Sequence, residues 1–598
     1  MMNQEPRPNN LVAMFEGSVA RYSERPLFGT PDEKGNYSWA TYAQVSKRVD
    51  SCRSALARLD VGPGDAVGII ARNCVEWAVT ALASYGLRAR FIPMYERELS
   101  SAWKYIIHDA NIKVLFVSTQ DVFDQVQAMR EELPGLKHLF LIHGSGDQSL
   151  PVLEAEGAKD PVSSQQPEKD EIAVLIYTSG TTGRPKGVLL SHGNFTSNVY
   201  AAAKLFTNLD HESRSLAILP WAHSYGQTGE LYFFMYLGAS IGLIRDVTTI
   251  AEDMALVKPT FLLTVPRIFN LMHDGIQKTI REKGGLAKLL FDMGLRAAEE
   301  LRHARNEGRS EPWMAALKYR IADKVVFHKI RERFGGRLTG ALSGSATMKL
   351  EVGQFFADIN IPVYDCYGLS ETTPAVTVNC PSAHRPGSVG RAIEDVRVVI
   401  DKSIAGGQGE EGEIIVYGPN VMKGYHNMPE ATAAVMTEDG GFRTGDCGRL
   451  DEDGYLYITG RIKEQYKLEN GKYVFPGALE AEIQLLHWVQ NVMVYGEGKA
   501  FNICIIVPEL SFLAEMAREK GLNSDPATMI LDPKLTEMAI EEIESHLKGK
   551  FGGYEIPKRC ILVHENFSIE NGMLTQTMKL KRRAVLQAYQ GEIDKAYA

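Results

Sequence analysis

The sequence predicts an α/β protein with largely parallel sheets, followed by a β-rich segment and a separate α+β segment. Three observations support this prediction. Short apolar runs alternate with helical patterns through the first two-thirds of the chain, short strands with glycine-containing turns begin after about residue 393, and a third pattern begins beyond Arg461. The 598 residues are enough for roughly three to four domain-sized units.

The first part of the chain contains apolar runs of the length expected for buried strands. They are residues 67–70, 114–117, 139–142, 172–177 and 216–219. A helical stretch at about residues 76–85 follows the first run, and buried strands separated by helices are typical of βαβ units. Residues 231–244, the most apolar stretch, are too few for a membrane span of ~20 residues. We therefore expect a buried helix there that runs into a strand.

The later part of the chain changes its pattern. Residues 285–335 are strongly helical and rich in charge, which indicates helices with a solvated face. Residues 412–418 predict a strand of the β-rich segment. The segment beyond Arg461 predicts two strands and two helices, near residues 492–495, 503–507, 511–520 and 538–548.

Composition narrows the function classes. The net charge of -9 argues against a nucleic-acid partner, because a nucleic-acid binder needs a concentrated basic face. Seven scattered cysteines without C-x-x-C spacing indicate reduced, mostly buried thiols in the cytosol rather than a disulfide framework or a zinc site. The polar N-terminus lacks the apolar core of a signal peptide. We expect a cytoplasmic protein without a transmembrane segment.

A loop rich in glycine and hydroxyl groups, residues 177–187, is the first candidate for a binding site. It follows an apolar run and contains three glycines, four Ser/Thr hydroxyls and Lys186. Backbone N–H groups and a lysine in such a loop can bind a polyphosphate. The spacing is not that of a Walker A loop. From these residues alone, a flexible surface loop is an equally good interpretation.

Five further segments follow in a fixed order, at residues 219–223, 367–372, 443–446, 458–464 and 574–579. Together with the loop they resemble the motifs of the adenylate-forming superfamily, which includes acyl-CoA synthetases, luciferases and peptide-synthetase adenylation domains. The resemblance extends from about residue 38 to about residue 585. It implies a large N-terminal AMP-binding domain (residues 1–461) of two α/β subdomains and a small β-rich subdomain. It also implies a small, mobile α+β C-terminal domain (residues 462–598).

The resemblance implies a nucleotide site. The residues that it assigns to the nucleotide are Thr178, Ser179, Gly180, Thr181, Thr182, Gly183, Lys186, Ser343, Gly344, Ser345, Asp365, Tyr367, Gly368, Ser370, Thr372, Asp446, Ile458, Arg461 and Lys579. Asp446 would accept hydrogen bonds from both ribose hydroxyls, and Arg461 would add a ribose or phosphate contact. Glu371 and Thr178 would hold a Mg²⁺ between the phosphates. Taken alone, Glu371 is more typical of a solvated surface and Asp446 of a turn.

The resemblance assigns catalysis to Lys579, His223, Thr178 and Glu371. Lys579 would bridge the substrate carboxylate and the α-phosphate. One charge-assisted hydrogen bond of this kind is worth roughly 1.5–3 kcal/mol, or about ten- to hundredfold in rate. His223 would orient the substrate, although a single histidine in an apolar setting is more often structural. The alternative for Lys579 is a basic, solvated C-terminal helix shared with Lys581, Arg582 and Arg583.

The implied reaction has two steps. ATP adenylates a carboxylate with release of pyrophosphate, and a thiol then displaces AMP to form a thioester. Between the steps the C-terminal domain would rotate about a hinge at Lys463. The rotation would present Lys579 first and then a thiol loop formed by Gly471, Lys472 and Tyr473. The implied ligands are ATP, Mg²⁺ and coenzyme A.

A narrower resemblance points to long-chain fatty acyl-CoA synthetases and implies a fatty acid substrate. It rests on the helical segment 285–335, on residues 265–268 and on the terminal residues 575–581. Apolar residues that follow His223 could line an acyl tunnel, although they are more often core. The sequence departs from the family pattern at Glu464, Gln576, Cys366 and residues 89–91. We expect Cys366 and Trp221 to reshape the acyl pocket.

The sequence leaves several alternatives open. The acyl acceptor could be the phosphopantetheine of a carrier protein, and the chain could be a non-catalytic acyl- or nucleotide-binding relative. A homodimer and a peripheral contact with the inner membrane face are both compatible with the sequence. The acyl chain length is not set by any motif.

Overall fold

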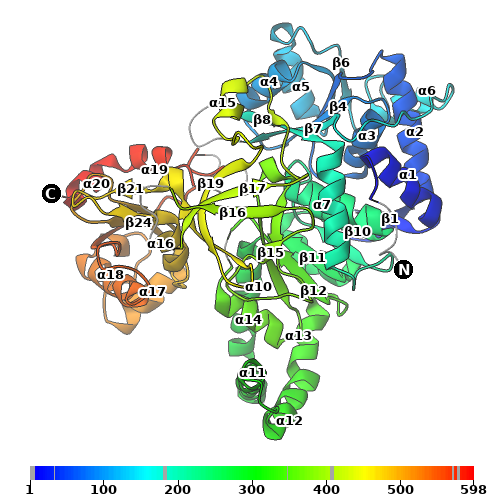
Figure 1. The fold of residues 1–598 in the computed structure, drawn as a ribbon. Coiled ribbons are helices and arrows are strands. Elements are labelled where there is room, and N and C mark those ends of the chain that lie inside the picture. The colour runs from blue at the N-terminus through cyan, green and yellow to red at the C-terminus, as the bar shows by residue number, and fades with distance from the viewer. Residues whose placement is uncertain are drawn as a thin grey trace. The chain divides into compact units, whose positions relative to one another are not determined.

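The computed structural model describes residues 7–32, 34–178, 185–346, 348–403, 410–568, 571–575 and 580–597, without the side chains of Lys463 and Glu519. The chain forms two compact units (Figure 1). The first unit consists of Met1–Val398, Val416–Phe442 and Gly454–Leu456. The second unit consists of Val399–Ile415, Arg443–Asp453 and Tyr457–Ala598. The α/β class is confirmed, with a large N-terminal and a separate C-terminal domain. The boundary after Arg461 stays a prediction.

A seven-stranded sheet in the order β18-β8-β7-β4-β3-β5-β6 belongs to the first unit. Its strands are β3 (Ala66–Ile70), β4 (Arg90–Met94), β5 (Ile112–Val117), β6 (His138–Leu141), β7 (Ile172–Thr178), β8 (Lys186–Ser191) and β18 (Gly424–Tyr425). The strands from β7 to β6 run parallel, whereas β8 and β18 are antiparallel to their neighbours. The predicted parallel strands are therefore confirmed.

Helices precede or connect these strands, as βαβ units require. They are α1 (Leu11–Tyr22), α2 (Tyr42–Arg58), α3 (Val75–Tyr85), α4 (Ser100–Asp109), α5 (Gln120–Ala128), α6 (Leu150–Gly157) and α7 (His192–Leu205). α2 begins with a capping box. The Thr41 side chain accepts from the backbone N–H of Gln44, and the Gln44 side chain accepts from the backbone N–H of Thr41. Trp103 and Ile106 of α4 share one hydrophobic core with Leu115 of β5.

A four-stranded sheet in the order β2-β1-β10-β9 contains the most apolar stretch of the chain. Its strands are β1 (Pro26–Pro31), β2 (Tyr37–Thr41), β9 (Arg214–Ala217) and β10 (Ser240–Leu243). A π-helix (Tyr225–Tyr232) and α8 (Phe233–Leu237) lead into β10, so the predicted buried helix followed by a strand is confirmed. Within the described ranges, no helix has both the length and the apolar character needed to cross a bilayer.

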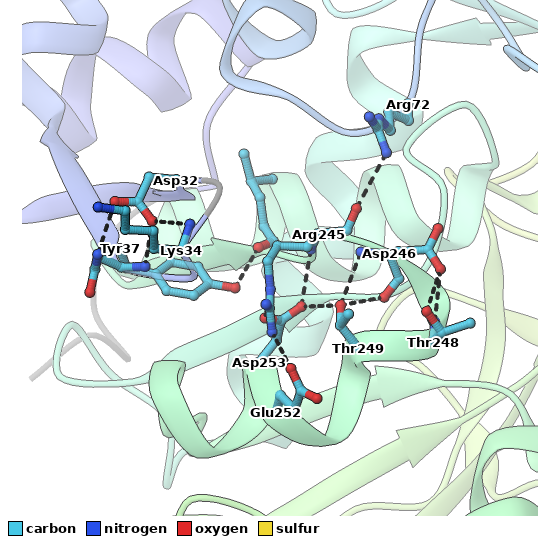
Figure 2. Close-up of polar contacts among 12 residues, drawn as sticks. Asp32, Lys34, Tyr37, Arg72, Arg245, Asp246, Thr248, Thr249, Glu252 and Asp253 are labelled. Carbon is cyan, nitrogen blue, oxygen red and sulfur yellow. Dashed lines mark hydrogen bonds and ion pairs between the residues drawn. The ribbon is translucent and has the colours of Figure 1, made fainter.

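A polar network joins the end of β10 to α9 (Ile250–Val257) and is drawn in Figure 2. The backbone N–H and Nε of Arg245 donate to the fully buried Asp253 at 3.0 and 2.7 Å. The Tyr37 hydroxyl donates to the Leu243 carbonyl at 2.8 Å, and the Arg72 guanidinium donates to the Arg245 carbonyl at 3.3 Å. The network anchors α9 to the sheet of β10. Its charged and polar groups form hydrogen bonds with one another.

A five-stranded sheet carries much of the candidate site. Its strands, in order, are β11 (Phe261–Thr264), β12 (Gly340–Ser343), β13 (Val363–Gly368), β14 (Ala375–Val378) and β15 (Arg391–Ala392). The first three are parallel, and β14 and β15 are antiparallel additions. α10 (Pro266–Lys283) and α14 (Leu350–Asp358) share a hydrophobic core with this sheet.

The predicted helical segment is confirmed and forms a helical hairpin. It consists of α11 (Gly285–Asn306), α12 (Trp313–Ala322), a π-helix (Asp323–Phe327) and α13 (His328–Arg333). Ala297, Leu301 and Ala315 pack α11 against α12. Both helices extend away from the β11–β15 sheet of the same unit (Figure 1).

Most of the second unit is β-rich or α+β, as the sequence predicts. One sheet contains β16 (Arg397–Asp401), β17 (Gly412–Tyr417), β19 (Phe442–Leu450) and β20 (Leu456–Arg461). A hairpin of β21 (Tyr466–Lys467) and β22 (Tyr473–Val474) precedes a sheet of β23 (Val489–Tyr495), β24 (Ile503–Pro508) and β25 (Arg559–Leu562). Its helices are α16 (Pro476–Ile483), α17 (Leu510–Glu519), α18 (Pro533–Leu547), α19 (Arg582–Ala588) and α20 (Gln590–Tyr597). Trp488 and Leu535 are fully buried in its core.

Candidate active site

The predicted phosphate loop connects two antiparallel strands of the seven-stranded sheet. Thr178 at the end of β7 pairs directly with Lys186 at the start of β8. β7 is buried from Ala173 to Tyr177, directly before Thr178. The Lys186 Nζ lies 4.8 Å from the centre of the Tyr425 ring, within the range of a cation–π contact. The predictions for Ser179, Gly180, Thr181, Thr182 and Gly183 fall outside the described residues.

Glu371, the predicted metal ligand, lies in a short 3-10 helix (Ser370–Thr372) directly after β13. Its Oε1 accepts a hydrogen bond of 2.9 Å from the Tyr425 hydroxyl, and its backbone carbonyl accepts one of 2.8 Å from the Met422 N–H. Burial and the Glu371 charge raise the pKa of Tyr425, so the phenol remains a neutral donor. Tyr425 therefore contacts both Lys186 and Glu371. No pattern in the sequence distinguishes it from the other tyrosines.

His223 lies in a turn that other residues hold in place. The Asn73 amide donates to the Leu219 carbonyl and accepts from the Trp221 N–H, both at 2.8 Å. The Tyr225 N–H donates to His223 Nδ1 at 3.2 Å, which leaves the proton of a neutral ring on Nε2. The neighbouring Ser224 hydroxyl donates to the Ser370 hydroxyl at 3.3 Å. The fold thus brings the His223 turn next to the helix that carries Glu371.

A cavity opens beside His223. Its volume is about 780 Å³ including space open to solvent. Its polar lining residues include Asn198, His223, Thr228, Ser345 and Tyr367. Its apolar lining residues include Val199, Leu205, Phe206, Phe233, Phe261, Leu263 and Leu342. The lining can therefore contact both a polar group and a hydrocarbon.

Cys366 and Trp221, the two residues expected to shape this cavity, lie in different places. Cys366 belongs to the cavity wall, where its thiol donates to the Ser343 carbonyl at 3.3 Å. Trp221 is fully buried and is not among the lining residues. Its indole N–H donates to Glu230 at 3.2 Å, and its ring packs against Trp77 at 5.8 Å between centroids. Of the two side chains, Cys366 alone lines the cavity.

Three polar residues stand in register at the carboxyl ends of parallel strands, where ligands bind in open α/β sheets. They are Thr264 on β11, Ser343 on β12 and Asp365 on β13. Each has a buried side-chain oxygen that lacks a hydrogen-bond partner in the described part of the chain. Burial raises the pKa of Asp365 to about 7. Such oxygens fit a ligand that brings N–H or O–H donors, as a nucleotide does.

This row alternates along the strands with Leu263, Leu342 and Cys366, which line the cavity. Because successive side chains in a strand point to opposite faces, the row and the cavity lie on opposite sides of the sheet. Thr264 was not predicted from the sequence, since its place in the row depends on strand register. The row therefore lies on a different face of the sheet from Leu263, Leu342 and Cys366, and Thr264 and Ser343 are fully buried there.

The remaining predicted residues of the first unit form close backbone contacts. A Cβ on Gly344 would lie 3.1 Å from the Tyr225 ring, and one on Gly368 would lie 1.8 Å from the Pro374 carbonyl oxygen. Ser345 has a φ of +70°. The Thr372 hydroxyl donates to the Pro374 and Leu369 carbonyls, which holds its own turn together. Contacts of these residues with a nucleotide stay predictions.

In the second unit, Asp446 on β19 and Arg461 at the end of β20 form an ion pair. Arg461 Nε lies 2.9 Å from Asp446 Oδ1, and the carboxylate is nearly buried whereas the guanidinium is half-exposed. The Asp446 N–H donates to the Thr444 hydroxyl at 3.1 Å, which helps to fix the backbone at this position. Ile458 lies on β20, and the ribose contacts predicted for this group stay predictions.

Lys463 lies in a 3-10 helix (Ile462–Glu464) that directly follows β20, as expected for a hinge at the end of an element. Lys579 and Gln576 fall outside the described residues. Arg582, three positions after Lys579, is mostly covered, with 23% of its side chain exposed. It pairs with Glu480, which is 13% exposed, lies 4.0 Å from Glu464, and donates to the Val494 carbonyl at 3.1 Å. The alternative of a solvated basic helix is therefore wrong for Arg582, because its guanidinium is held by Glu480 and the Val494 carbonyl.

The predicted thiol loop is the tight turn between β21 and β22. Gly471 has a φ of +80°, a conformation that favours glycine, and the Leu468 N–H donates to the Lys472 carbonyl at 2.9 Å. Lys472 Nζ lies 4.4 Å from the centre of the Tyr554 ring, and Lys467 Nζ lies 4.7 Å from that of Tyr473. The turn is thus ordered by its own residues, and its role toward a thiol stays a prediction.

The donor set suits magnesium supplied together with a substrate. Among the residues that the structure describes, no three His, Cys, Asp or Glu side chains are grouped so that they could hold a metal by themselves. Mg²⁺ is usually bound by one or two carboxylates together with substrate phosphates rather than by a complete protein cage. The Glu371 carboxylate and the Thr178 hydroxyl provide oxygen ligands of that kind.

Family models match nearly the whole chain. The model described as AMP-binding enzyme matches residues 15–426, and the model described as AMP-binding enzyme C-terminal domain matches residues 463–598. The chain belongs to the AMP-binding enzyme family. It is an adenylate-forming, acyl-activating enzyme, and the adenylate-forming resemblance of its motifs is confirmed.

Curated relatives of this AMP-binding enzyme align over nearly its full length. Fatty acyl-CoA synthetase A of Dictyostelium discoideum is 30% identical over 601 residues, which cover 95% of this chain and 87% of the relative. Long-chain-fatty-acid–CoA ligase 5 of Rattus norvegicus is 30% identical, with 98% and 88% covered. The adenylation domain of a Mycobacterium chelonae carboxylate reductase superimposes with a TM-score of 0.76 at 22% identity, covering 99% of this chain and 92% of that domain. At this identity the structural likeness shows the fold alone.

Proposed function

We propose that this AMP-binding enzyme activates a fatty acid with ATP, releases pyrophosphate, and transfers the acyl group to the thiol of coenzyme A. The observation that carries the proposal is the cavity beside His223, which polar and apolar side chains line together. The relatives named as fatty acyl-CoA synthetases support the same substrate class.

The cavity suits an acid with a hydrocarbon tail. Phe206, Phe233 and Phe261 in its wall would bury the tail, and each buried CH₂ contributes ~0.8 kcal/mol. Because Nδ1 of His223 accepts from the Tyr225 N–H, the proton on Nε2 can orient the substrate carboxylate. His223 would thus position the acid without a net proton transfer.

Glu371 and Thr178 would hold the Mg²⁺ that accompanies ATP, and this ion would neutralise phosphate charge when bound. The Tyr425 hydroxyl orients the Glu371 carboxylate, and the Tyr425 ring contacts Lys186. Thr264, Ser343 and Asp365 would receive donors of the nucleotide on the polar face of the β11–β13 strands. In the second unit, Arg461 holds the Asp446 carboxylate that would accept from the ribose hydroxyls.

In the first step a carboxylate oxygen attacks the α-phosphorus, and the bond from that phosphorus to pyrophosphate breaks. Lys579 would stabilise the negative charge that accumulates between the two reacting anions. In the second step the thiol loses its proton, its sulfur attacks the acyl carbon, and AMP leaves. A rotation about Lys463 would replace Lys579 with the turn at Gly471–Tyr473 between the steps.

Acid-dependent exchange of labelled pyrophosphate into ATP tests the proposal. We expect exchange to rise with acyl length across short, long-chain and aryl acids, and to be followed by AMP and thioester formation when coenzyme A is added. Exchange without thioester formation would favour a carrier-protein acceptor. No exchange with any acid would favour a non-catalytic binding protein.

Two substitutions separate the half-reactions. Lys579→Ala should lower pyrophosphate exchange about ten- to hundredfold. Lys581→Ala, at an exposed neighbouring residue, is the control and should leave exchange unchanged. Lys463→Pro should spare exchange and impair thioester formation. Equal losses in both half-reactions for Lys463→Pro would contradict the hinge.

A further inference from the structure

One helix of the first unit is apolar on two opposite faces. α12, the π-helix after it and α13 form one uninterrupted helix from Trp313 to Arg333. Its inner face is buried through Ala315, Ala322, Val326, Phe327 and Ile330. Its outer face carries Trp313, Leu317, Ile321 and Val325, which are 71%, 48%, 44% and 42% exposed. These four residues are called the outer row below.

The outer row is a concentration of exposed apolar surface. Thirteen large apolar side chains of the described residues are exposed, and five of them, the outer row and Met314, lie on this helix. Residues four positions apart lie on the same helix face, so the row is continuous. A helix normally carries polar residues where it faces water. A contiguous apolar surface of this kind marks a site of interaction with a partner or a membrane.

Basic residues surround the outer row. Arg320 and Lys324 follow its side, Lys318 lies on the other side, and Lys329 continues the row at its end. All four are exposed. The acidic residues of the helix, Asp323 and Glu332, contact Arg331 and His328 instead. Residues 313–333 contain six Lys or Arg and two acidic residues, although the whole chain has a net charge of -9. The charge around the row therefore favours an anionic partner.

The hairpin presents the outer row on a firm support. α11 and α12 extend away from the β11–β15 sheet (Figure 1). Gly294 of α11 permits close packing, since a Cβ there would lie 2.5 Å from the Ala322 side chain. The inner face thus holds the two helices together and leaves the outer row available.

We propose that the outer row and its basic border dock this enzyme on the surface of an anionic lipid bilayer. The apolar side chains enter the boundary between headgroups and acyl chains, with the Trp313 ring at the interface. Lys318, Arg320 and Lys324 extend their charged ends to lipid phosphates. The docking surface belongs to the first unit and is separate from the cavity, so its test does not depend on the identity of the acyl substrate.

Vesicle flotation of the full chain tests the docking surface. We expect binding to vesicles of phosphatidylcholine with phosphatidylglycerol, weaker binding to pure phosphatidylcholine, and loss of the difference at high salt because salt screens the charge term. The double substitution Leu317→Gln with Ile321→Gln should lower the bound fraction about tenfold, since it removes buried apolar area. Lys318→Gln with Lys324→Gln should lower it on anionic vesicles only. Leu531→Gln, at a side chain of the second unit that is 76% exposed, is the matched control and should bind as the parent does.

Tryptophan fluorescence gives a second readout at the row itself. Vesicles should shift the emission to shorter wavelength, and Trp313→Phe should abolish most of the shift while binding persists. Circular dichroism and acid-dependent exchange equal to the parent's show that the variants are folded. Absence of parental binding, or full binding by the Leu317/Ile321 variant, overturns the proposal. A parental dimer that this variant dissociates, without any change in vesicle binding, assigns the row to a second copy and also overturns it.

Discussion

Two carboxylates near the candidate site of the first unit and three carboxylates of the second unit have different kinds of partner. In the first unit, Glu371 accepts from the Tyr425 hydroxyl and Glu230 accepts from the Trp221 indole, so both partners are neutral donors. Three carboxylates of the second unit have arginine partners, as the buried Asp253 of the first unit has in Arg245. The pairs are Asp446 with Arg461, Glu480 with Arg582 and Glu413 with Arg443. Neither Glu371 nor Glu230 has a cationic partner among the residues described.

The difference follows from what each carboxylate can do. A carboxylate that already has an arginine partner is held in place by the charge-assisted hydrogen bond, which suits a group that positions a hinge region or a ribose. A carboxylate with a neutral donor keeps its charge available for a cation that arrives with a ligand, as proposed for Glu371. Where no cation can arrive, burial favours the neutral acid instead, and burial raises the pKa of Glu230 to about 8.

The largest effect is expected where an arginine partner is removed. Arg582→Met leaves the mostly buried Glu480 without its cation and should lower the free energy of unfolding of the second unit by about 3–5 kcal/mol. Urea unfolding of the full chain, followed in the second unit through Trp488, measures the loss. Arg583→Met, at the exposed neighbouring residue, is the control. If Glu480→Gln restores no stability to Arg582→Met, the unpaired charge is not the cause.

The next effect concerns the pH dependence of stability through Glu230. The folded pKa of about 8 lies above the unfolded value, so unfolding between about pH 5 and pH 8 releases a proton and stability falls as pH rises. Glu230→Gln removes this proton release. The stability of the variant relative to the parent should rise by about 1 kcal/mol per pH unit over this window, as measured by urea unfolding at several pH values. A pH-independent difference would show that Glu230 is already ionised.

A smaller effect, on rate, is expected at Glu371. Glu371→Gln keeps the shape of the side chain and removes the charge proposed to bind Mg²⁺. Exchange of pyrophosphate into ATP should fall about hundredfold, or ~2.7 kcal/mol, and require more magnesium. Glu131→Gln, at an exposed acidic residue of the same unit, should have no effect. If Glu371→Gln exchanges pyrophosphate as fast as the parent at the same magnesium concentration, Glu371 does not bind the metal. Its neutral partner then has no functional meaning beside the arginine partner of Asp446.

The smallest expected effect is on the exchange rate when Glu371 loses its neutral donor, the Tyr425 hydroxyl. Tyr425→Phe keeps the ring beside Lys186 and removes the hydrogen bond to Glu371. Loss of about 0.5–1.5 kcal/mol should lower exchange about two- to tenfold and shift its magnesium dependence. Tyr417 is a matched control, because Arg397 lies over its ring and its hydroxyl donates to Asp439 at 3.0 Å. Tyr417→Phe should leave exchange unchanged, and equal effects of the two substitutions would indicate a general loss of stability.

Much of the fold was predictable because local patterns report local structure. The apolar run at residues 172–177 is strand β7, and the helical pattern at residues 285–335 became α11 to α13. Period and composition indicate such elements because a strand or helix is formed by residues close in sequence. The exposure of apolar side chains on the outer face of this helix was not predictable in the same way. Charge in this segment suggested solvated helices, and the outer row instead exposes apolar side chains to solvent.

The sequence by itself determined the family, the order of the motifs and the residue types that its chemistry needs, including Glu371, Asp446 and Lys186. Only the tertiary structure decided their partners. Tyr425 reaches Glu371 across 54 positions of the chain, and the row of Thr264, Ser343 and Asp365 exists only through the register of three strands. The physical reason is that these contacts join residues distant in sequence. Periodicity records which face of an element is buried, but it does not record which other element covers that face.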